Sequence, residues 1–206
     1  RARRMTTLRA AVVGLGMMGR HHARLLQAMP DVEFAGAVDT AGDRFEVVRP
    51  PAQVHRTIED LLESTTPDFA VVAVPTEDHV DAVRRLTTAG VSVLVEKPLA
   101  GSSEEAREII DLVERNGVRG AVGHVERCNP ALIELRRRAL AGQIGELFLI
   151  ATERIGPFPE RIRDVGVVKD LATHDLDLVR WLGASPVRLV AAQTMHRMGR
   201  EHEDVV

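Results

Sequence analysis

The run from Ala10 to Leu26 constrains the fold of this 206-residue chain more than any other part of the sequence. Four apolar residues lead into Gly14, glycines follow at positions 16 and 19, and helix-forming residues continue from there. The order predicts a buried strand that turns through glycines into a helix, with glycines allowing a tight turn, a close backbone approach and close packing of helix on strand. Because the first amides of a helix have no intrahelical partner, an anion such as a pyrophosphate is favoured at this turn.

A carboxylate stands where a dinucleotide-binding fold needs one. The next predicted strand, 32–38, is followed by Asp39, 20 residues after Gly19, and such folds place an acidic residue there to bind the adenosine ribose hydroxyls. No arginine or serine directly follows Asp39 to receive a 2′-phosphate, so NAD is favoured over NADP, and Arg44 is the residue that opposes this preference. From the glycines alone, an ordinary turn stays an open alternative.

Apolar runs alternate with helical patterns through the first part of the chain. Predicted strands at 69–74, 91–95 and 118–122 alternate with helices at 79–89 and 102–117. Such nearly continuous apolar strands are typical of a parallel sheet covered on both faces. We therefore expect an α/β protein whose residues 1–125 form an NAD-binding Rossmann domain with a doubly wound parallel sheet.

From residue 126 the pattern changes. Asn129 and Pro130 suit the start of a basic helix that ends at Gly142. Predicted strands at 146–154 and 187–194 flank a helix over 170–182, which indicates a truncated α+β open-sheet domain over 126–206. Both alternating faces of the first strand are apolar. We expect a homo-oligomer through this sheet, or exposure of an aggregation-prone segment.

Composition and charge exclude several classes of function. The formal net charge is −3, and no basic face suggests nucleic acid as a partner. The single cysteine, Cys128, can form no internal disulfide and no zinc site of the CxxC kind, so no metal is expected. No stretch reaches the roughly 20 apolar residues of a membrane span, and no secretory signal precedes the first strand. The sequence predicts a cytoplasmic protein without a membrane partner.

Four motifs, in this order and spacing, resemble the Gfo/Idh/MocA family of sugar and polyol oxidoreductases. They are the three glycines, then Pro75-Thr76 with His79, then Glu96-Lys97-Pro98, and last the run from Asp170 through His174 to Asp177. Segments 120–130 and 154–175 are most similar to the UDP-N-acetylglucosamine 3-dehydrogenases, which use NAD to oxidise a nucleotide-sugar hydroxyl to a ketone. Cys128 departs from the aromatic residue expected at its position.

The resemblance implies three sets of site residues. Those that contact the cofactor are Gly14, Gly16, Met17, Met18, Gly19, Asp39, Pro75, Thr76, His79, Glu96 and Lys97. Those that carry catalysis are Lys97, Asp170 and His174. Those that bind substrate are Lys97, Arg127, Asn129, Arg154, Arg161, Arg163 and His174. The three arginines of 154–163 could clamp a diphosphate by charge-assisted hydrogen bonds, and a solvated basic loop is the equal alternative.

The predicted catalytic residues suit alcohol oxidation. Such a reaction needs a hydride acceptor and a base for the hydroxyl proton. Asp170 and His174 stand at i and i+4, so on an α-helix their side chains share one face and the carboxylate can orient the imidazole. Lys97 can hydrogen-bond the reacting oxygen. The alternatives are a chance pair on a solvated helix face and a surface lysine before a turn proline. His21 and His22 are expected on the helix surface or in packing.

The sequence thus favours an NAD-dependent dehydrogenase that oxidises a secondary hydroxyl, C3, of a nucleotide sugar such as UDP-N-acetylglucosamine. One alternative is a dehydrogenase of a free sugar or inositol. An alternative of another class is a protein that binds NAD and a sugar without turnover.

Overall fold

The computed structural model describes residues 7–156, 166–199 and 201–206, and the chain divides into two compact units. The first unit is Arg1–Gly123 and the second is His124–Val206. In the part of the chain that is described, no helix is both long and apolar enough to cross a membrane.

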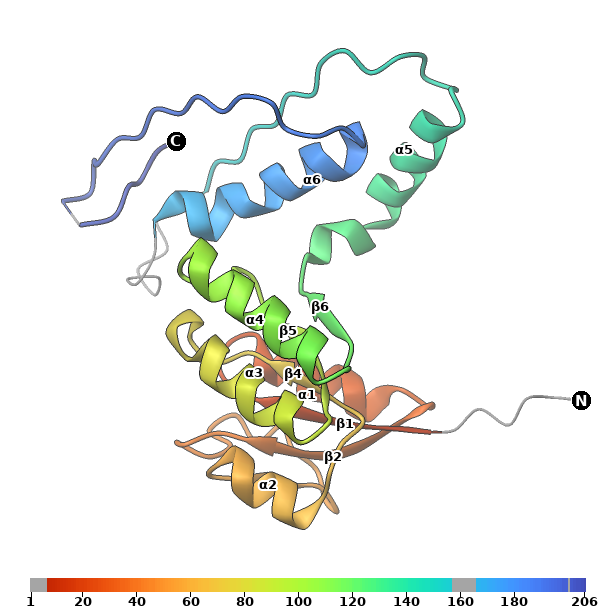
Figure 1. Ribbon diagram of the computed structural model, residues 1–206, viewed down its shortest axis with the longest axis vertical. Helices are drawn as coiled ribbons and strands as arrows, with labels where there is room; N and C mark the ends of the chain where they lie inside the picture. The colour runs from red at the N-terminus through yellow and green to blue at the C-terminus, as the bar shows by residue number, and fades with distance from the viewer. Residues whose placement is uncertain (1–6, 157–165, 200) are drawn as a thin grey trace, which may run out of the picture. The chain divides into compact units, whose positions relative to one another are not determined.

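A six-stranded parallel sheet forms the centre of the first unit (Figure 1). Its strands run in the order β3-β2-β1-β4-β5-β6, which is the doubly wound order of a Rossmann fold. The expectation of such a sheet is therefore confirmed. The strands are β1 (Leu8–Val13), β2 (Val32–Val38), β3 (Gln53–His55), β4 (Phe69–Val72), β5 (Ser92–Val95) and β6 (Gly120–Val122).

Both faces of this sheet are buried, which explains the continuous apolar runs. Ala11 and Val13 of β1 pack in one apolar cluster, whereas Ala10 and Val12 pack in the other, because successive side chains of a strand point to opposite faces. The first cluster lies under α2, α3 and α4, and the second includes α1. The helices are α1 (Gly19–Ala28), α2 (Ile58–Ser64), α3 (His79–Thr88) and α4 (Ser103–Arg115).

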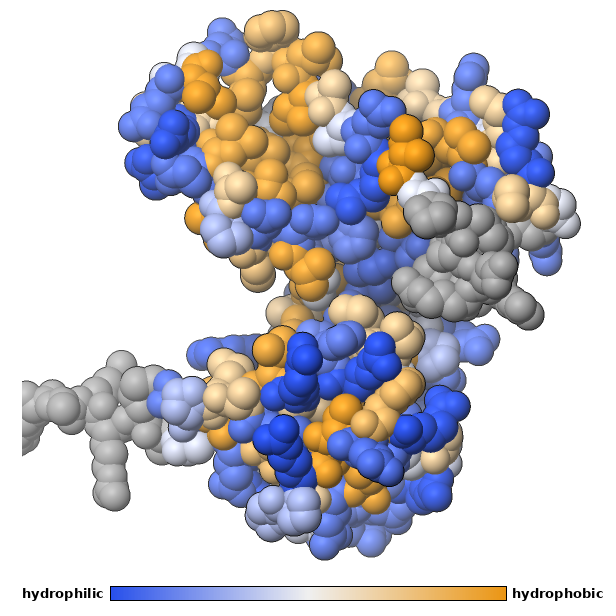
Figure 2. All heavy atoms as spheres, turned by 180° about the vertical axis from the view of Figure 1, so that it is seen from behind, coloured by the Kyte–Doolittle hydropathy of each residue, from blue (hydrophilic) through white to orange (hydrophobic). Residues whose placement is uncertain are grey.

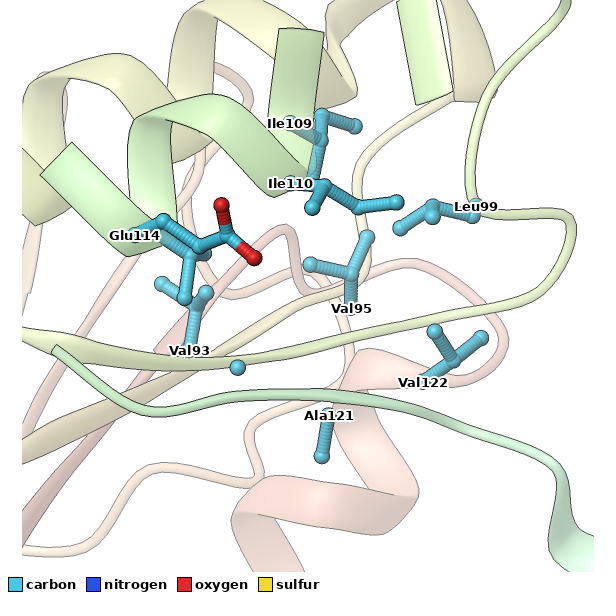
Figure 3. A pocket seen from close by; sticks show the side chains of 10 residues that line it. Val93, Val95, Leu99, Ile109, Ile110, Glu114, Ala121 and Val122 are labelled. Atoms are coloured by element: carbon cyan, nitrogen blue, oxygen red, sulfur yellow. The ribbon is translucent and has the colours of Figure 1, made fainter. Parts of the chain in front are cut away.

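Helices α3 and α4 lie side by side on the sheet (Figure 1). Side chains of α4, among them Ile110, face β5 and β6 across an apolar cavity of about 200 Å³. Figure 3 shows Leu99, which follows the Lys97-Pro98 bend, at one side of this cavity. The segment after β5 is thus packed against α4.

The crossover from β2 to β3 contains no helix, as the paired prolines at 50 and 51 predicted. Helix α1 holds this loop through the side chains of Arg20 and Gln27. The Arg20 guanidinium lies 4.5 Å from the centre of the Phe45 ring, and the Gln27 amide donates to the Val47 carbonyl at 2.9 Å. The loop that follows Asp39 is therefore attached to the helix that follows the glycines.

The second unit consists of short helical segments. They are the 3₁₀ turn η2 (Val125–Cys128), α5 (Pro130–Leu140), the π-helical turn η3 (Val168–Ala172) and α6 (Thr173–Gly183). Asn129 caps α5, with its side chain accepting from the Ala131 amide at 3.0 Å, and Pro130 occupies the first position. The predicted start of this helix is confirmed.

The two strands predicted in the second unit are wrong. Segments 146–154 and 187–194 contain no strand among their described residues, and Phe148 and Leu189 are 93% and 87% exposed. A strand needs a neighbour to pair its backbone, and neither segment has one here; one antiparallel bridge joins Met195 and Val205. Figure 2 shows apolar side chains gathered on the surface of this unit, in the upper part of the view. Association through a sheet stays a prediction.

Candidate dinucleotide site and catalytic segments

The three glycines of the first turn serve different purposes. Gly14 has φ of +91°, and a Cβ there would lie 2.7 Å from the Ala73 carbonyl oxygen. A Cβ at Gly19 would collide with the Gly14 carbonyl. Around the Cβ position of Gly16, in contrast, no atom lies within 4 Å. The first and third glycines are needed by the fold, whereas the second leaves open space before the first turn of α1. This space, at the N-terminal end of α1, suits a pyrophosphate.

Asp39 joins the end of β2 to the glycine turn. Its Oδ2 accepts from the Leu15 amide and its Oδ1 accepts from the Ala41 amide, both at 2.8 Å. A carboxylate oxygen has two lone pairs, so each oxygen keeps capacity for one ribose hydroxyl. The carboxylate is half-buried and lies beside the turn. The residues present therefore fit an adenosine ribose and pyrophosphate. Met17 and Met18, in the same turn, are exposed.

His79 lies in the interior, at the start of α3. Its side chain is buried, with Nδ1 3.1 Å from the Leu99 carbonyl oxygen and Nε2 3.1 Å from the Val74 carbonyl oxygen. Because both ring nitrogens face backbone carbonyls, they are not directed at a ligand. The ring instead joins the end of β4 to the segment after Lys97. Pro75 and Thr76 lie at the same end of β4, in the turn that leads to η1 (Thr76–Asp78).

Glu96 and Lys97 follow β5 directly. Glu96 is buried, and its Oε1 lies 2.7 Å from His22 Nε2. Burial alone would raise the pKa of the Glu96 carboxyl, but the hydrogen bond and charge of His22, with the amide and charge of Lys97, outweigh burial and hold that pKa below its ordinary value. Both oxygens of Glu96 are engaged within the unit, so its contact with a cofactor stays a prediction. Lys97 is half-buried beside it.

These segments meet because of the sheet topology. The turns after β1, β4 and β5 all leave the carboxyl edge of the parallel sheet, and β1 and β4 are neighbours across the point where the strand order reverses. Open α/β sheets bind ligands at that edge. The structure thus brings together the glycine turn, Pro75 and the Glu96-Lys97 pair within the first unit.

The segment with Asp170 and His174 is not one α-helix, which corrects the prediction. Asp170 lies in the π-helical turn η3, whereas His174 lies in α6. A π-turn holds one more residue than an α-turn, so the i,i+4 geometry of an ideal α-helix does not apply across it. The Thr173 hydroxyl lies 3.1 and 2.9 Å from the Val168 and Lys169 carbonyl oxygens and shares its one proton between these two acceptors in the widened turn. π-turns occur frequently at functional sites.

Two of the predicted substrate-binding arginines are paired with carboxylates. Arg127 donates to Asp177 from Nε at 2.7 Å, and Arg154 donates to Asp175 from Nε at 2.8 Å. Arg154 also donates to Glu126 at 3.1 Å. Hydrogen bonds with these carboxylates raise the pKa of both arginines. These pairs attach η2 and Arg154 to α6.

Asn129, Arg161 and Arg163 were also predicted to bind the substrate. Asn129 uses its side-chain oxygen to cap α5, and Arg161 and Arg163 lie outside the described residues. Within the described residues, no group of three His, Cys, Asp or Glu side chains could hold a metal ion.

Sequence reasoning missed the roles of His22 and Asp177. His22 follows Gly19 by three residues, and this spacing on a helix puts it on the face that packs toward the sheet. Asp177 stands three residues after His174 and is buried. A charged residue on the inner face of a helix is rarely buried unless it is paired, so its position predicts a side chain of opposite charge nearby.

The fold and the glycine turn define a dinucleotide-binding Rossmann domain. A family model described as an oxidoreductase family with an NAD-binding Rossmann fold matches residues 8–124, and this chain belongs to that family, Gfo/Idh/MocA. The expected family and the expected NAD-binding fold are confirmed.

Known relatives are similar over most of this chain. The UDP-N-acetylglucosamine 3-dehydrogenase of Acidithiobacillus ferrooxidans is 32% identical over 89% of this chain and 57% of its own length. The myo-inositol dehydrogenase Hyg17 of Streptomyces leeuwenhoekii is 35% identical over 88% of this chain and 58% of its own. The crystal structure of GenD2 from gentamicin A biosynthesis in complex with NAD superposes with a TM-score of 0.82 at 29% identity, over 99% of this chain and 62% of that one. The chain spans about three fifths of the length of these relatives.

Proposed function

We propose that this protein is an NAD-dependent dehydrogenase that oxidises a secondary hydroxyl of a sugar or polyol. The observation that carries the proposal is the open space at Gly16, beside the Asp39 carboxylate and on the same edge of the sheet as Lys97. Membership of an NAD-binding oxidoreductase family supports it.

The first unit would hold the cofactor at three places. The backbone of the glycine turn that leads into α1 would bind the pyrophosphate, and the missing side chain at Gly16 would let that backbone approach it. Asp39 accepts hydrogen bonds from the ribose hydroxyls and repels a 2′-phosphate, which favours NAD over NADP. Met17, Met18, Pro75 and Thr76 border the same edge, and His79 holds the β4 end in place.

NAD supplies the hydride acceptor when it is bound. Lys97 hydrogen-bonds the reacting hydroxyl oxygen and keeps it oriented. His174 accepts the hydroxyl proton, and Asp170 orients the imidazole and stabilises its charged form. The π-turn that carries Asp170 supports a functional role for this segment.

For the substrate we propose a nucleotide sugar such as UDP-N-acetylglucosamine, oxidised at C3. The similarity to the Acidithiobacillus enzyme supports this choice. Arg127 and Arg154 already donate to carboxylates. Each can bind a diphosphate only if it contacts the carboxylate and the diphosphate together, or if the diphosphate replaces the carboxylate. Hyg17 supports the second candidate, a free polyol such as inositol, which needs no cationic clamp.

Two experiments test these proposals. Calorimetric titration of NAD into Gly16→Ala should show lost affinity with a melting temperature that does not fall, because the fold has room for the added methyl group. Gly19→Ala is the matched control and should lose stability. NADH formation measured with UDP-N-acetylglucosamine, N-acetylglucosamine and myo-inositol separates the substrates. Binding of NAD and sugar without NADH formation on any of them would favour a non-catalytic binding protein.

A further inference from the structure

His22 and Glu96 stand 74 positions apart and meet inside the first unit. His22 lies in α1, three residues after Gly19, and Glu96 stands between β5 and Lys97. The imidazole Nε2 lies 2.7 Å from Glu96 Oε1, and the Glu96 side chain is 9% exposed. A buried carboxylate is stable only when it is paired, so this contact belongs to the folded structure rather than to the surface.

The second oxygen of Glu96 reaches the backbone of its neighbour. Oε2 accepts from the Lys97 amide at 3.3 Å. Gly123 closes the space on the other side, because a Cβ there would lie 3.2 Å from the same oxygen. His22 and Lys97 are the residues whose interactions lower the pKa of the Glu96 carboxyl. One buried group therefore connects α1 with the backbone of Lys97.

We propose that His22 and Glu96 are positioning residues that couple the pyrophosphate end of α1 to the placement of Lys97. The effect of this coupling on catalysis rests on the proposed function. The coupling itself is a link between NAD binding and the Lys97 backbone amide. An anion held by the first turn of α1 fixes the helix that carries His22. His22 holds Glu96, and Glu96 holds the Lys97 backbone, so binding at one segment orders the other.

Hydrogen exchange of the Lys97 amide, followed by NMR on the full chain, tests the coupling without any turnover. In the wild type, NAD should slow this exchange. His22→Ala should speed it about tenfold, the worth of one hydrogen bond to a charged group, and should abolish the effect of NAD. His22→Gln keeps an N–H donor for Glu96 and should restore both. His21→Ala is the matched control, because His21 is the neighbouring exposed histidine on the same helix.

Binding and rate give a second measurement. By calorimetry, the Kd of NAD should rise by less than about tenfold in His22→Ala and Glu96→Gln. The kcat should fall by up to about a hundredfold, the effect of misplacing a catalytic group, with the KM for sugar unchanged. Rescue of kcat by His22→Gln separates positioning from general loss of structure. If His22→Ala does not fold, Glu96→Gln provides the same test.

The outcomes decide the two proposals separately. A wild type that binds NAD but turns over no sugar contradicts the proposed function and leaves the exchange measurement to judge the coupling. If the Lys97 amide exchanges in His22→Ala as in the wild type, or if His21→Ala has the same effect, the coupling is overturned even in an active enzyme.

Discussion

Arg127 donates to both carboxylate oxygens of Asp177, a residue 50 positions away, with Arg127 Nε 2.7 Å from Asp177 Oδ2. Asp177 is buried on the inner side of α6, and Nε2 of His124 lies 3.8 Å from its Oδ1. This pair attaches the turn η2 to the helix that carries His174.

Removal of this carboxylate should destabilise the second unit. We expect Asp177→Ala to lower the free energy of unfolding by about 2 kcal/mol, because it deletes a buried acceptor of two charge-assisted hydrogen bonds. Urea unfolding measures the change. Arg138→Ala, which removes an exposed pair with Glu134 on α5, should change it much less, because solvent screens exposed ion pairs. Equal effects of the two variants would contradict a special role for the buried pair.

Cofactor choice should depend on Asp39. We expect the wild type to bind NAD more tightly than NADP, and Asp39→Ala to narrow the difference by about tenfold, since the repulsion of a 2′-phosphate is lost. Affinity for NAD should also fall, because the Leu15 and Ala41 amides lose their acceptor. Titration with both cofactors measures this. Tighter binding of NADP by the wild type would overturn the assignment.

The predicted catalytic residues should affect rate more than cofactor binding. Lys97→Ala and His174→Ala should each lower kcat by at least about 10²-fold, as expected for loss of an acid-base group. The Kd of NAD should change little, because neither residue is predicted to contact the adenosine half. Steady-state kinetics and calorimetry give both values, with His21→Ala as the control. Near-normal kcat in both variants would show that the site lies elsewhere.

The pH dependence of stability should reveal the Glu96 carboxylate. Its folded-state pKa lies below its ordinary value, so its contribution is present above an unfolded-state pKa of about 4.3 and is lost as the pH falls through the folded-state pKa. The free energy of unfolding should therefore fall less steeply on acidification in Glu96→Gln than in the wild type. Urea unfolding at a series of acidic pH values measures the slopes. Identical slopes would contradict the pairing with His22.

The exposed apolar side chains of the second unit should govern association. Phe148→Asp removes the most exposed large apolar side chain among the described residues and should lower the mean mass of the protein in concentrated solution. Light scattering over a concentration series measures this. A wild type that stays monomeric at all concentrations would rule out association through this segment.

The first unit could be predicted because its signals are local. Two-sided burial makes the central strands β1 and β4 continuous apolar runs, and the glycine turn fixes where α1 begins. The edge strand β3 was not predicted, because its three residues, Gln53–His55, form no apolar run. The strands predicted at 146–154 and 187–194 failed because pairing is a property of a neighbour and not of the run itself. The π-turn at Asp170 leaves no mark in the pattern of apolar residues.

Long-range contacts of polar side chains could not be predicted either. The carbonyls that surround His79 belong to Val74 and Leu99, and the partner of His22 is 74 positions away. Arg127 and Arg154 looked available for a substrate because the carboxylates that engage them come from other segments, mainly from α6 and for Arg154 also from η2. Only folding shows which charges are already neutralised.

Gly16 differs from Gly14 and Gly19 in the reason for its missing side chain. Neither a crowded neighbour nor a left-handed backbone requires the missing side chain at this position, so the polypeptide by itself would fold as well with alanine there, and with less chain entropy to lose. Glycine at this position therefore lowers the stability of the fold and leaves room for a molecule that is not part of the chain. A glycine that the fold does not require, in a turn that leads from a strand into a helix N-terminus, points to a ligand at that turn.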